Sequence, residues 1–213
     1  MLVRDIMRSP VVGVSPATTL QDAYRTMREK GFRHLAVLDG ERLAGVVTDR
    51  DLRLATSALA PVPFPADSAV SAIMCTEPLT ANADDAVEDA ARVMRERKIG
   101  CLPVVDDGRV IGIITGIDLL DALIRMTGVD KPSGRLEVYL PDRPGELARL
   151  TAFMGERELN IHSILTYPEG TERVRTVLRI GSIETRLVAQ DLRKAGFEVV
   201  LSLIHISEPT RPY

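Results

Sequence analysis

The chain has 213 residues, of which 45% are hydrophobic and 27% are charged, and this composition is typical of a soluble globular protein of one or two domains. A formal net charge of −3, with arginines spread among carboxylates, disfavours a nucleic-acid partner. No apolar run reaches the roughly 18 residues that a membrane span requires, and no secretory signal is visible, so we expect a cytoplasmic protein with no membrane partner.

One unit occurs twice in the first part of the chain. The segment GVVTDRDL at 45–52 returns 67 positions later (112 − 45) as GIITGIDL at 112–119. The same offset relates Ile6-Met7 to Ile73-Met74. A repeat at a fixed offset predicts that one structural unit is duplicated, and we place the copies at residues 1–58 and 70–126.

Each copy is expected to begin with a loop and a helix. Apolar residues follow helical spacing from Leu20 to Met27 and from Val87 to Met94. Capping-box patterns precede these stretches, with Thr18 and Gln21 in the first copy and Asp85 and Glu88 in the second.

Two strands and a second helix are expected to follow in each copy. The strands are predicted at 35–38 and 43–47, and again at 102–105 and 110–114. Asp-Gly turns at 39–40 and 107–108 join them as hairpins. The second helix is expected to begin just past Thr48 in the first copy and just past Thr115 in the second.

Two breaks divide the chain. The Pro-rich stretch at 59–69 cannot be a helix or a central strand, because proline lacks the N–H group and fixes φ, so it is expected to connect the copies. A second break at 127–134 is expected to be a linker that ends the repeated region.

A different fold is predicted for residues 135–200. Alternation at Leu136, Val138 and Leu140 predicts a strand, and strands are also expected at 161–167, 174–180 and 197–200. Two helices are expected between them, the first with Leu147, Leu150, Thr151 and Met154 on its apolar face, the second with Leu187, Val188, Leu192 and Ala195 and an end at Gly196. The order βαββαβ is the ferredoxin-like arrangement, which makes the whole chain α+β.

The two copies resemble a pair of cystathionine-β-synthase (CBS) domains. The Gly-h-h-Thr-x-x-Asp segment of each copy (h, hydrophobic) and the Leu-x-Val strand before it carry the resemblance. It implies two β-α-β-β-α repeats that form one module, the Bateman module. The third region resembles an ACT domain through Asp142–Leu147 (DRPGEL) and Asn160-Ile161. A CBS pair followed by an ACT domain is similar in layout to the acetoin-utilization regulator family.

The CBS resemblance implies an adenine-nucleotide cleft at the Thr and Asp of each repeat. A carboxylate such as Asp51 accepts hydrogen bonds from the two hydroxyls of a ribose. Thr48 is expected where a strand turns into a helix, where free N–H groups favour a phosphate, and Arg50 and Arg33 add positive charge. The predicted nucleotide-binding residues are Val12, Arg33, His34, Ala36, Thr48, Arg50, Asp51, Cys101, Thr115 and Asp118, with Val46 also expected to flank the adenine.

The two clefts are expected to differ. The second copy keeps Thr115 and Asp118 but has Gly116-Ile117 in place of Asp49-Arg50. The first cleft should therefore prefer a charged nucleotide, unless an arginine from the neighbouring copy reaches the second. AMP, ADP, ATP, NAD and S-adenosylmethionine are the candidate ligands. As an alternative, the Thr and Asp side chains only cap a helix.

The ACT resemblance implies a possible amino-acid site. Gly145 would let the backbone approach a ligand closely, and the Asn160 side chain can donate and accept hydrogen bonds. Such sites usually lie between two ACT domains, so binding would imply a homodimer. Both residues could equally be ordinary turn residues.

We expect no enzymatic activity, no obligatory cofactor and no metal site. Cys75 and Cys101 lack the spacing of zinc ligands and are expected to be reduced thiols. Cys101 has no His and acid at motif spacing that would make it a nucleophile. The leading hypothesis is a regulator that senses an adenine nucleotide. Two alternatives are an interaction module that assembles or regulates a partner enzyme, and a subunit of an enzyme whose catalytic part is missing.

The last residues, 201–213 (LSLIHISEPTRPY), resemble the translation of a transposon-type sequencing adapter. We therefore expect the native sequence to stop near Val200, within the last predicted strand, and residues 201–213 not to be native. The alternative is a genuine strand followed by a Pro-rich tail.

Overall fold

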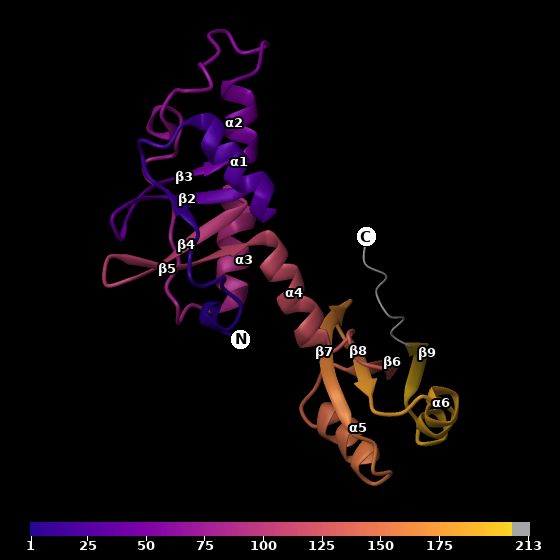
Figure 1. The fold of residues 1–213 in the computed structure, drawn as a ribbon. Coiled ribbons are helices and arrows are strands. Elements are labelled where there is room, and N and C mark those ends of the chain that lie inside the picture. The colour runs from indigo at the N-terminus through magenta and orange to yellow at the C-terminus, as the bar shows by residue number, and fades with distance from the viewer. Residues whose placement is uncertain (206–213) are drawn as a thin grey trace. The chain divides into compact units, whose positions relative to one another are not determined.

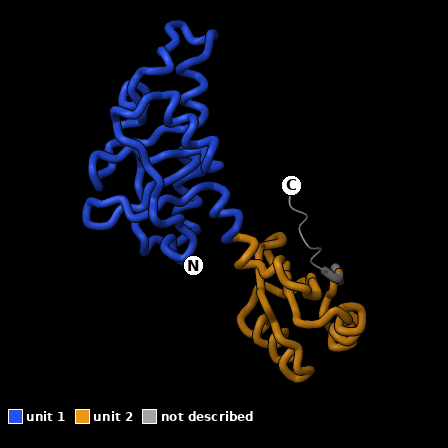
Figure 2. The backbone as a smooth tube through the Cα atoms, in the orientation of Figure 1, with its two compact units in different colours: residues 1–122 blue, residues 123–213 orange. Residues whose placement is uncertain are grey.

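The structure is a computed structural model that describes residues 1–205, with the side chains at 201, 202, 204 and 205 left out. The chain forms two compact units, residues 1–122 and 123–213 (Figure 2). The break between the units falls inside a helix, Gly116–Thr127. None of the described helices is long and apolar enough to cross a membrane.

The first unit contains the two copies, and their elements follow the same order (Figure 1). A short 3₁₀ helix opens each copy, at Val3–Asp5 and at Val70–Ala72. The first copy continues with β1 (Gly13–Val14), α1 (Leu20–Lys30), β2 (His34–Asp39), β3 (Arg42–Thr48) and α2 (Asp49–Ala55). The second copy continues with α3 (Val87–Arg97), β4 (Cys101–Asp106), β5 (Arg109–Thr115) and α4 (Gly116–Thr127).

The repeat order β-α-β-β-α is therefore confirmed, with one difference between the copies. In the first, β1 pairs in parallel with β2 and places Val14 opposite Val37. In the second, a single parallel bridge between Ala81 and Val104 stands at the same position. Between the copies, residues 59–69 contain no helix or strand, as expected of a connector rich in proline.

The predicted helix caps were wrong. The N-cap of α1 is Thr19, whose hydroxyl accepts a hydrogen bond from the Asp22 N–H (3.1 Å), whereas the Thr18 hydroxyl accepts from the Ser15 N–H in the preceding turn. Asp85 likewise accepts from the Asn82 N–H, and α3 begins after Ala86 without a side-chain cap. Both predicted caps thus serve the turn before the helix.

The opening segment of each copy packs into the other copy. Val3 is fully buried in the core of the second copy with Met94 and Leu102, and its N–H donates to the Asp85 carbonyl (2.9 Å). Val70 is fully buried in the core of the first copy, and its N–H donates to the Thr18 carbonyl (2.8 Å). The copies therefore exchange their first residues.

The second unit has the predicted ferredoxin-like order. Its elements are β6 (Ser133–Pro141), α5 (Glu146–Gly155), β7 (Ile161–Glu169), β8 (Arg173–Ile180), α6 (Thr185–Lys194) and β9 (Glu198–His205), and the antiparallel sheet has the order β7-β8-β6-β9. Leu136, Val138 and Leu140 alternate into a core with the helices, as the spacing predicted.

Three positions on the predicted apolar helix faces were wrong: Leu147, Leu187 and Ala195 are exposed, and Ala195 lies just past the end of α6. Leu147 and Leu187 are 44% and 57% exposed. The inward stripe of α5 is shifted by one residue and begins at Glu146, and Phe153, absent from the predicted face, is buried in it. Glu146 can be buried because the guanidinium groups of Arg143 and Arg149 lie 2.6 and 3.0 Å from its carboxylate.

Two boundaries also differ from the expected ones. β6 begins at Ser133, inside the stretch expected to be a linker, and β9 continues past Val200 to His205, pairing with β6 along its length. The rest of the stretch that resembles an adapter, residues 206–213, lies outside the described residues.

Candidate functional site

The Thr-x-x-Asp segment of the first copy forms a closed hydrogen-bonded turn at the start of α2. Asp51 Oδ2 accepts from the Thr48 N–H (2.9 Å) and from Thr48 Oγ1 (2.6 Å), and the Asp51 N–H donates to Thr48 Oγ1 (3.1 Å). The alternative that these two side chains cap the helix is therefore confirmed by their hydrogen bonds. Asp51 Oδ1 has no hydrogen-bond partner among the described residues, so this oxygen can still accept from a ligand.

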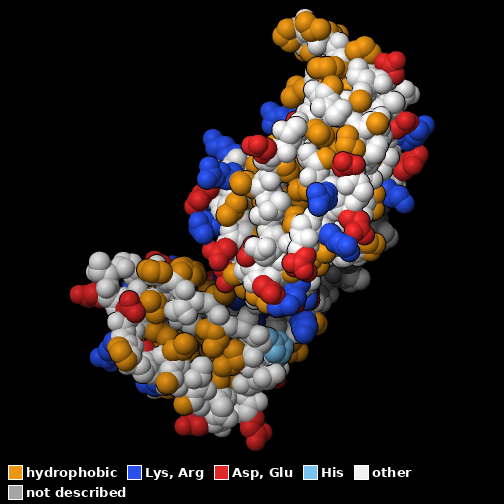
Figure 3. All heavy atoms as spheres, turned by 90° about the vertical axis from the view of Figure 1, so that its left-hand side faces the viewer, with side chains coloured by type: hydrophobic (Ala, Val, Ile, Leu, Met, Phe, Trp, Pro, Cys, Tyr) orange, Lys and Arg blue, Asp and Glu red, His pale blue; other side chains and the backbone are white. Residues whose placement is uncertain are grey.

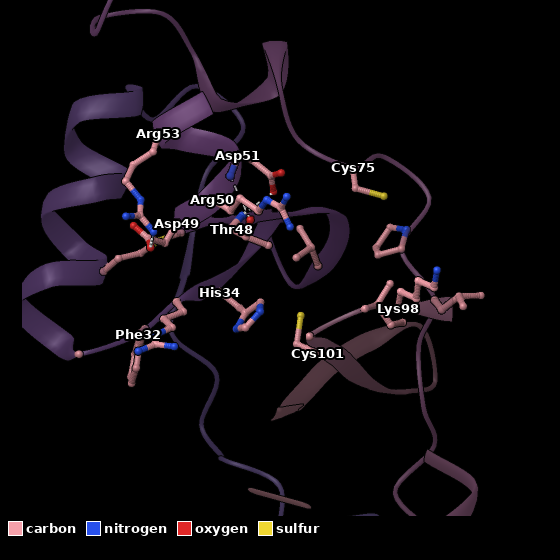
Figure 4. Close-up of a pocket in the computed structure, with 18 of the residues that line it drawn as sticks. Phe32, His34, Thr48, Asp49, Arg50, Asp51, Arg53, Cys75, Lys98 and Cys101 are labelled. Atoms are coloured by element: carbon pink, nitrogen blue, oxygen red, sulfur yellow. Dashed lines mark hydrogen bonds and ion pairs between the residues drawn. The ribbon is translucent and has the colours of Figure 1, made fainter. Parts of the chain in front are cut away.

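A cavity of about 980 Å³ lies beside this turn, and both copies line it (Figure 4). Its volume is in the range of small-molecule and cofactor sites. In the close-up, Arg50 and Asp51 face the cavity from α2, while Cys75, Lys98 and Cys101 come from the second copy. Polar and apolar lining residues are mixed, with Phe32, Val46, Leu79 and Ile99 among the apolar ones.

A reciprocal bridge between the copies builds this cavity. Val46 of β3 and Cys75 exchange two backbone hydrogen bonds, at 3.0 and 2.9 Å. A β-carbon on Gly45 would stand 2.5 Å from the Cys75 carbonyl oxygen, so only glycine admits the crossing segment. The Gly of the repeated motif therefore lets the two copies meet at the cleft.

The cavity carries an excess of positive charge. Its basic lining residues are Arg28, Arg33, Arg50, Arg53 and Lys98, and its acidic ones are Asp49, Asp51 and Glu77. Arg53 is paired with Asp49 at 2.5 Å. Within residues 1–205, no ion pair joins Arg28, Arg33, Arg50 or Lys98 to a carboxylate. Elsewhere on the surface, Figure 3 shows basic and acidic side chains intermingled on the face it draws.

The backbone of α2 contributes less to anion binding than we expected from the sequence. The Asp49 N–H donates to the Arg33 carbonyl (3.0 Å), and the Asp51 N–H donates to Thr48 Oγ1. These two groups already have acceptors in the protein, so they add little to the attraction that the cationic side chains exert on a phosphate.

His34 and Cys101 line the cavity from the first positions of β2 and β4. Burial lowers the pKa of His34, and this outweighs the opposite effect of nearby Asp51. Burial, with the Asp51 charge and Cys75 adding to it, raises the pKa of Cys101 to about 12. Both side chains are therefore uncharged at neutral pH, and Cys101 is not prepared to act as a nucleophile.

The structure brings together six of the ten predicted nucleotide-binding residues. Those that line the cavity are Arg33, His34, Thr48, Arg50, Asp51 and Cys101. Val12 and Ala36 are not among its lining residues, and Ala36 is fully buried within β2. Cys75 and Lys98 line it without having been predicted, although Cys75 follows the repeated Ile73-Met74 pair and could have been found through it.

Thr115 and Asp118 lie at the start of α4 and form a second turn like the first. Asp118 Oδ2 accepts from the Thr115 N–H (2.8 Å) and Oγ1 (2.5 Å). Here, however, Asp118 Oδ1 accepts from Arg8 Nε at 2.9 Å, and the Asp118 side chain is only 6% exposed. An arginine from the neighbouring copy does reach the second turn, but it binds the carboxylate.

Gly145 and Asn160 lie beyond opposite ends of α5. Gly145 has φ +94° and precedes the first residue of the helix, and a β-carbon there would meet no atom within 4 Å. The Asn160 carbonyl accepts from the Gly181 N–H (2.8 Å). Since a helix of this length spans about 15 Å, one chain does not bring the two residues to a common ligand. Among the described residues, no cluster of His, Cys, Asp and Glu could hold a metal ion.

Comparison with known proteins agrees with this architecture. The model of the CBS domain matches residues 3–57 and 70–125, and the model of the ACT domain matches residues 134–197. These segments correspond to the two copies and to the ferredoxin-like unit.

Three solved structures are similar to the CBS part of the chain. The CBS domain pair of protein MJ0100, in complex with 5′-methylthioadenosine and S-adenosyl-L-methionine, is 29% identical, with a TM-score of 0.52, and the match covers 58% of this chain and 95% of that one. CBSX2 in complex with AMP is 34% identical, with a TM-score of 0.51 and coverage of 58% and 96%. AcuB from Vibrio cholerae, named for acetoin utilization, is 30% identical, with a TM-score of 0.53 and coverage of 61% and 94%. The chain therefore belongs to the CBS domain family, with a tandem CBS pair followed by an ACT domain.

Proposed function

We propose that the chain is a non-enzymatic cytoplasmic regulator that binds an adenine nucleotide in the cavity between its two CBS copies. The observation that carries the proposal is found in one cavity: Asp51 Oδ1 has no hydrogen-bond partner, and several cations have no ion pair, among the residues that the structure describes. The carboxylate oxygen suits a ribose hydroxyl, and the cations suit a phosphate or a carboxylate of the ligand. Two similar CBS structures hold AMP or S-adenosylmethionine, which supports this ligand class.

The roles of the lining residues follow from their chemistry. Asp51 accepts from the ribose, with Thr48 fixing its orientation through two hydrogen bonds to Oδ2. Arg50 and Arg33 attract the phosphate. His34 and Cys101 are uncharged, so they offer the ligand a neutral wall. A role in catalysis has no support from these groups, because the Cys101 thiol keeps its proton at neutral pH.

Calorimetry and thermal-shift measurements with AMP, ADP, ATP, NAD and S-adenosylmethionine test the proposal. A ligand of the native state raises the apparent melting temperature by mass action. We expect binding by at least one of these compounds and its loss in Asp51→Asn. Asp67→Asn is the matched control, since it makes the same change at an exposed position outside the cavity. Absence of binding by all five compounds would favour the interaction module, which acts on a partner enzyme without a nucleotide.

We further propose that the ACT domain forms a homodimer and binds an amino acid between two copies. Gly145 and Asn160 of one chain are too far apart along α5 to share a ligand, so a common site requires Gly145 of one chain beside Asn160 of another. Analytical ultracentrifugation with and without each amino acid tests this. Dimerisation that one amino acid strengthens, and that Asn160→Ala makes insensitive to it, is the expected result. A monomer under all conditions would contradict it.

A further inference from the structure

The two CBS copies place different side chains at one equivalent position beside the Thr-x-x-Asp turn. Arg8 and Cys75 are separated by the repeat offset of 67 (75 − 8). Arg8 exchanges two backbone hydrogen bonds with Ile113, at 2.9 and 3.1 Å, just as Cys75 does with Val46. The backbone is therefore held in the same way at both positions, and the side chains account for the difference.

At the first turn, the equivalent residue is Cys75, and Asp51 Oδ1 has no hydrogen-bond partner among the described residues. At the second, Arg8 Nε donates to Asp118 Oδ1 at 2.9 Å and Thr115 occupies Oδ2, so both carboxylate oxygens are engaged. The Asp118 side chain is nearly inaccessible, whereas that of Arg8, which binds it, is half exposed.

From this difference we infer that Arg8 closes the second cleft to nucleotides, so that the chain binds one nucleotide and not two. The inference rests on the function proposed above and adds its stoichiometry. A ribose hydroxyl that displaced Arg8 would exchange a charge-assisted hydrogen bond for a weaker neutral donor, and would leave the guanidinium without its carboxylate. The second cleft also has Ile117 where the first has Arg50, so it offers less to a phosphate in return.

The repeat supplies the test, because each residue can be replaced by its counterpart. Isothermal titration with AMP and with ATP, under reducing conditions, should give about one site per native chain. Arg8→Cys should raise the stoichiometry to about two, and Cys75→Arg should abolish binding. In the double exchange, binding should return at the second cleft, where Asp118→Asn removes it and Asp51→Asn does not.

Two further variants guard against trivial outcomes. Arg4→Cys removes a positive charge from the same segment, where Arg4 pairs with exposed Asp84, and should leave one site. Arg8→Ala replaces Arg8→Cys if the latter fails to fold by circular dichroism. Two sites in the native chain, or one site in a folded Arg8 variant, would overturn the inference while leaving the proposed function intact. No binding by any variant would overturn both.

Discussion

Gly45 and Cys75 are in backbone contact that no side chain could share, since a β-carbon at Gly45 would come within 2.5 Å of the Cys75 carbonyl oxygen. This oxygen belongs to the backbone, so it cannot move aside as the end of a flexible side chain can. Position 45 must therefore be glycine for the two copies to meet at the cleft as they do.

Gly45→Ala should destabilise the first unit, because the bridge between Val46 and Cys75 must move or break. Overpacking of this kind typically costs about 1–3 kcal/mol. Urea denaturation monitored by circular dichroism measures the loss. Gly116→Ala is the control, because a β-carbon there meets nothing within 4 Å, and it should be close to neutral. Equal stabilities of the two variants would contradict the contact.

Arg50→Gln should weaken ATP more than adenosine. The Arg50 guanidinium has no carboxylate partner among the described residues, so its charge is available to a phosphate. Hydrogen bonds to charged groups contribute about 1.5–3 kcal/mol, which corresponds to roughly tenfold or more in Kd. Arg53→Gln is the control. Arg53 lines the same cavity but is already paired with Asp49, so its loss should change the ratio of the ATP and adenosine affinities little. Equal losses for ATP and adenosine in calorimetry would remove Arg50 from the phosphate site.

The first unit should become less stable in mild acid, because folding disfavours protonation of His34. Burial holds its pKa below 6.5 in the folded chain, so the unfolded chain takes up the proton first as the pH falls. The stability that depends on neutral His34 is complete above about pH 6.5 and is lost progressively as the pH falls toward the lower, folded pKa. The apparent melting temperature should drop as the pH falls below about 6.5. His34→Gln should reduce this drop, and His162→Gln, which changes an exposed histidine of the second unit, should not.

The two thiols should differ in reactivity. Cys75 is exposed, whereas Cys101 is buried and its pKa is about 12. At about pH 8 only about one Cys101 thiol in ten thousand is ionised, so alkylation by iodoacetamide should be confined to Cys75. Mass spectrometry of the native chain should show one modification, and Cys75→Ser should show none on the same timescale. Rapid modification of Cys101 in the folded protein would contradict its burial.

The sequence repeat predicted the elements of both copies because helical and strand spacing recur at a fixed offset. It also identified Thr48 and Asp51, and the departure of the second copy from the repeat singled out Arg50; all three residues line one cavity. It did not predict that Arg8 binds Asp118, because an offset shows which positions are equivalent and not that the opening segments cross to the other copy. Ala36 was expected beside the adenine, but its position in the middle of β2 places it in the buried interior.

In the ferredoxin-like unit, alternation along β6 predicted the buried residues, whereas the face of α5 was wrong at Leu147 and that of α6 at Leu187 and Ala195. The reason for α5 is the buried Glu146. A carboxylate is assigned to the outside by any hydrophobic pattern, and only the two arginines that bind it allow the helix to turn that side inward.

The exchange of opening segments links the folding of the two CBS copies. Because Val3 completes the core of the second copy, deletion of the first eight residues would remove a core side chain and the Arg8 backbone bridge from β5. Loss of the first residues would therefore destabilise the core around Met94 and Leu102 in the second copy. Neither copy, expressed as a contiguous segment, would contain all the residues of its own core.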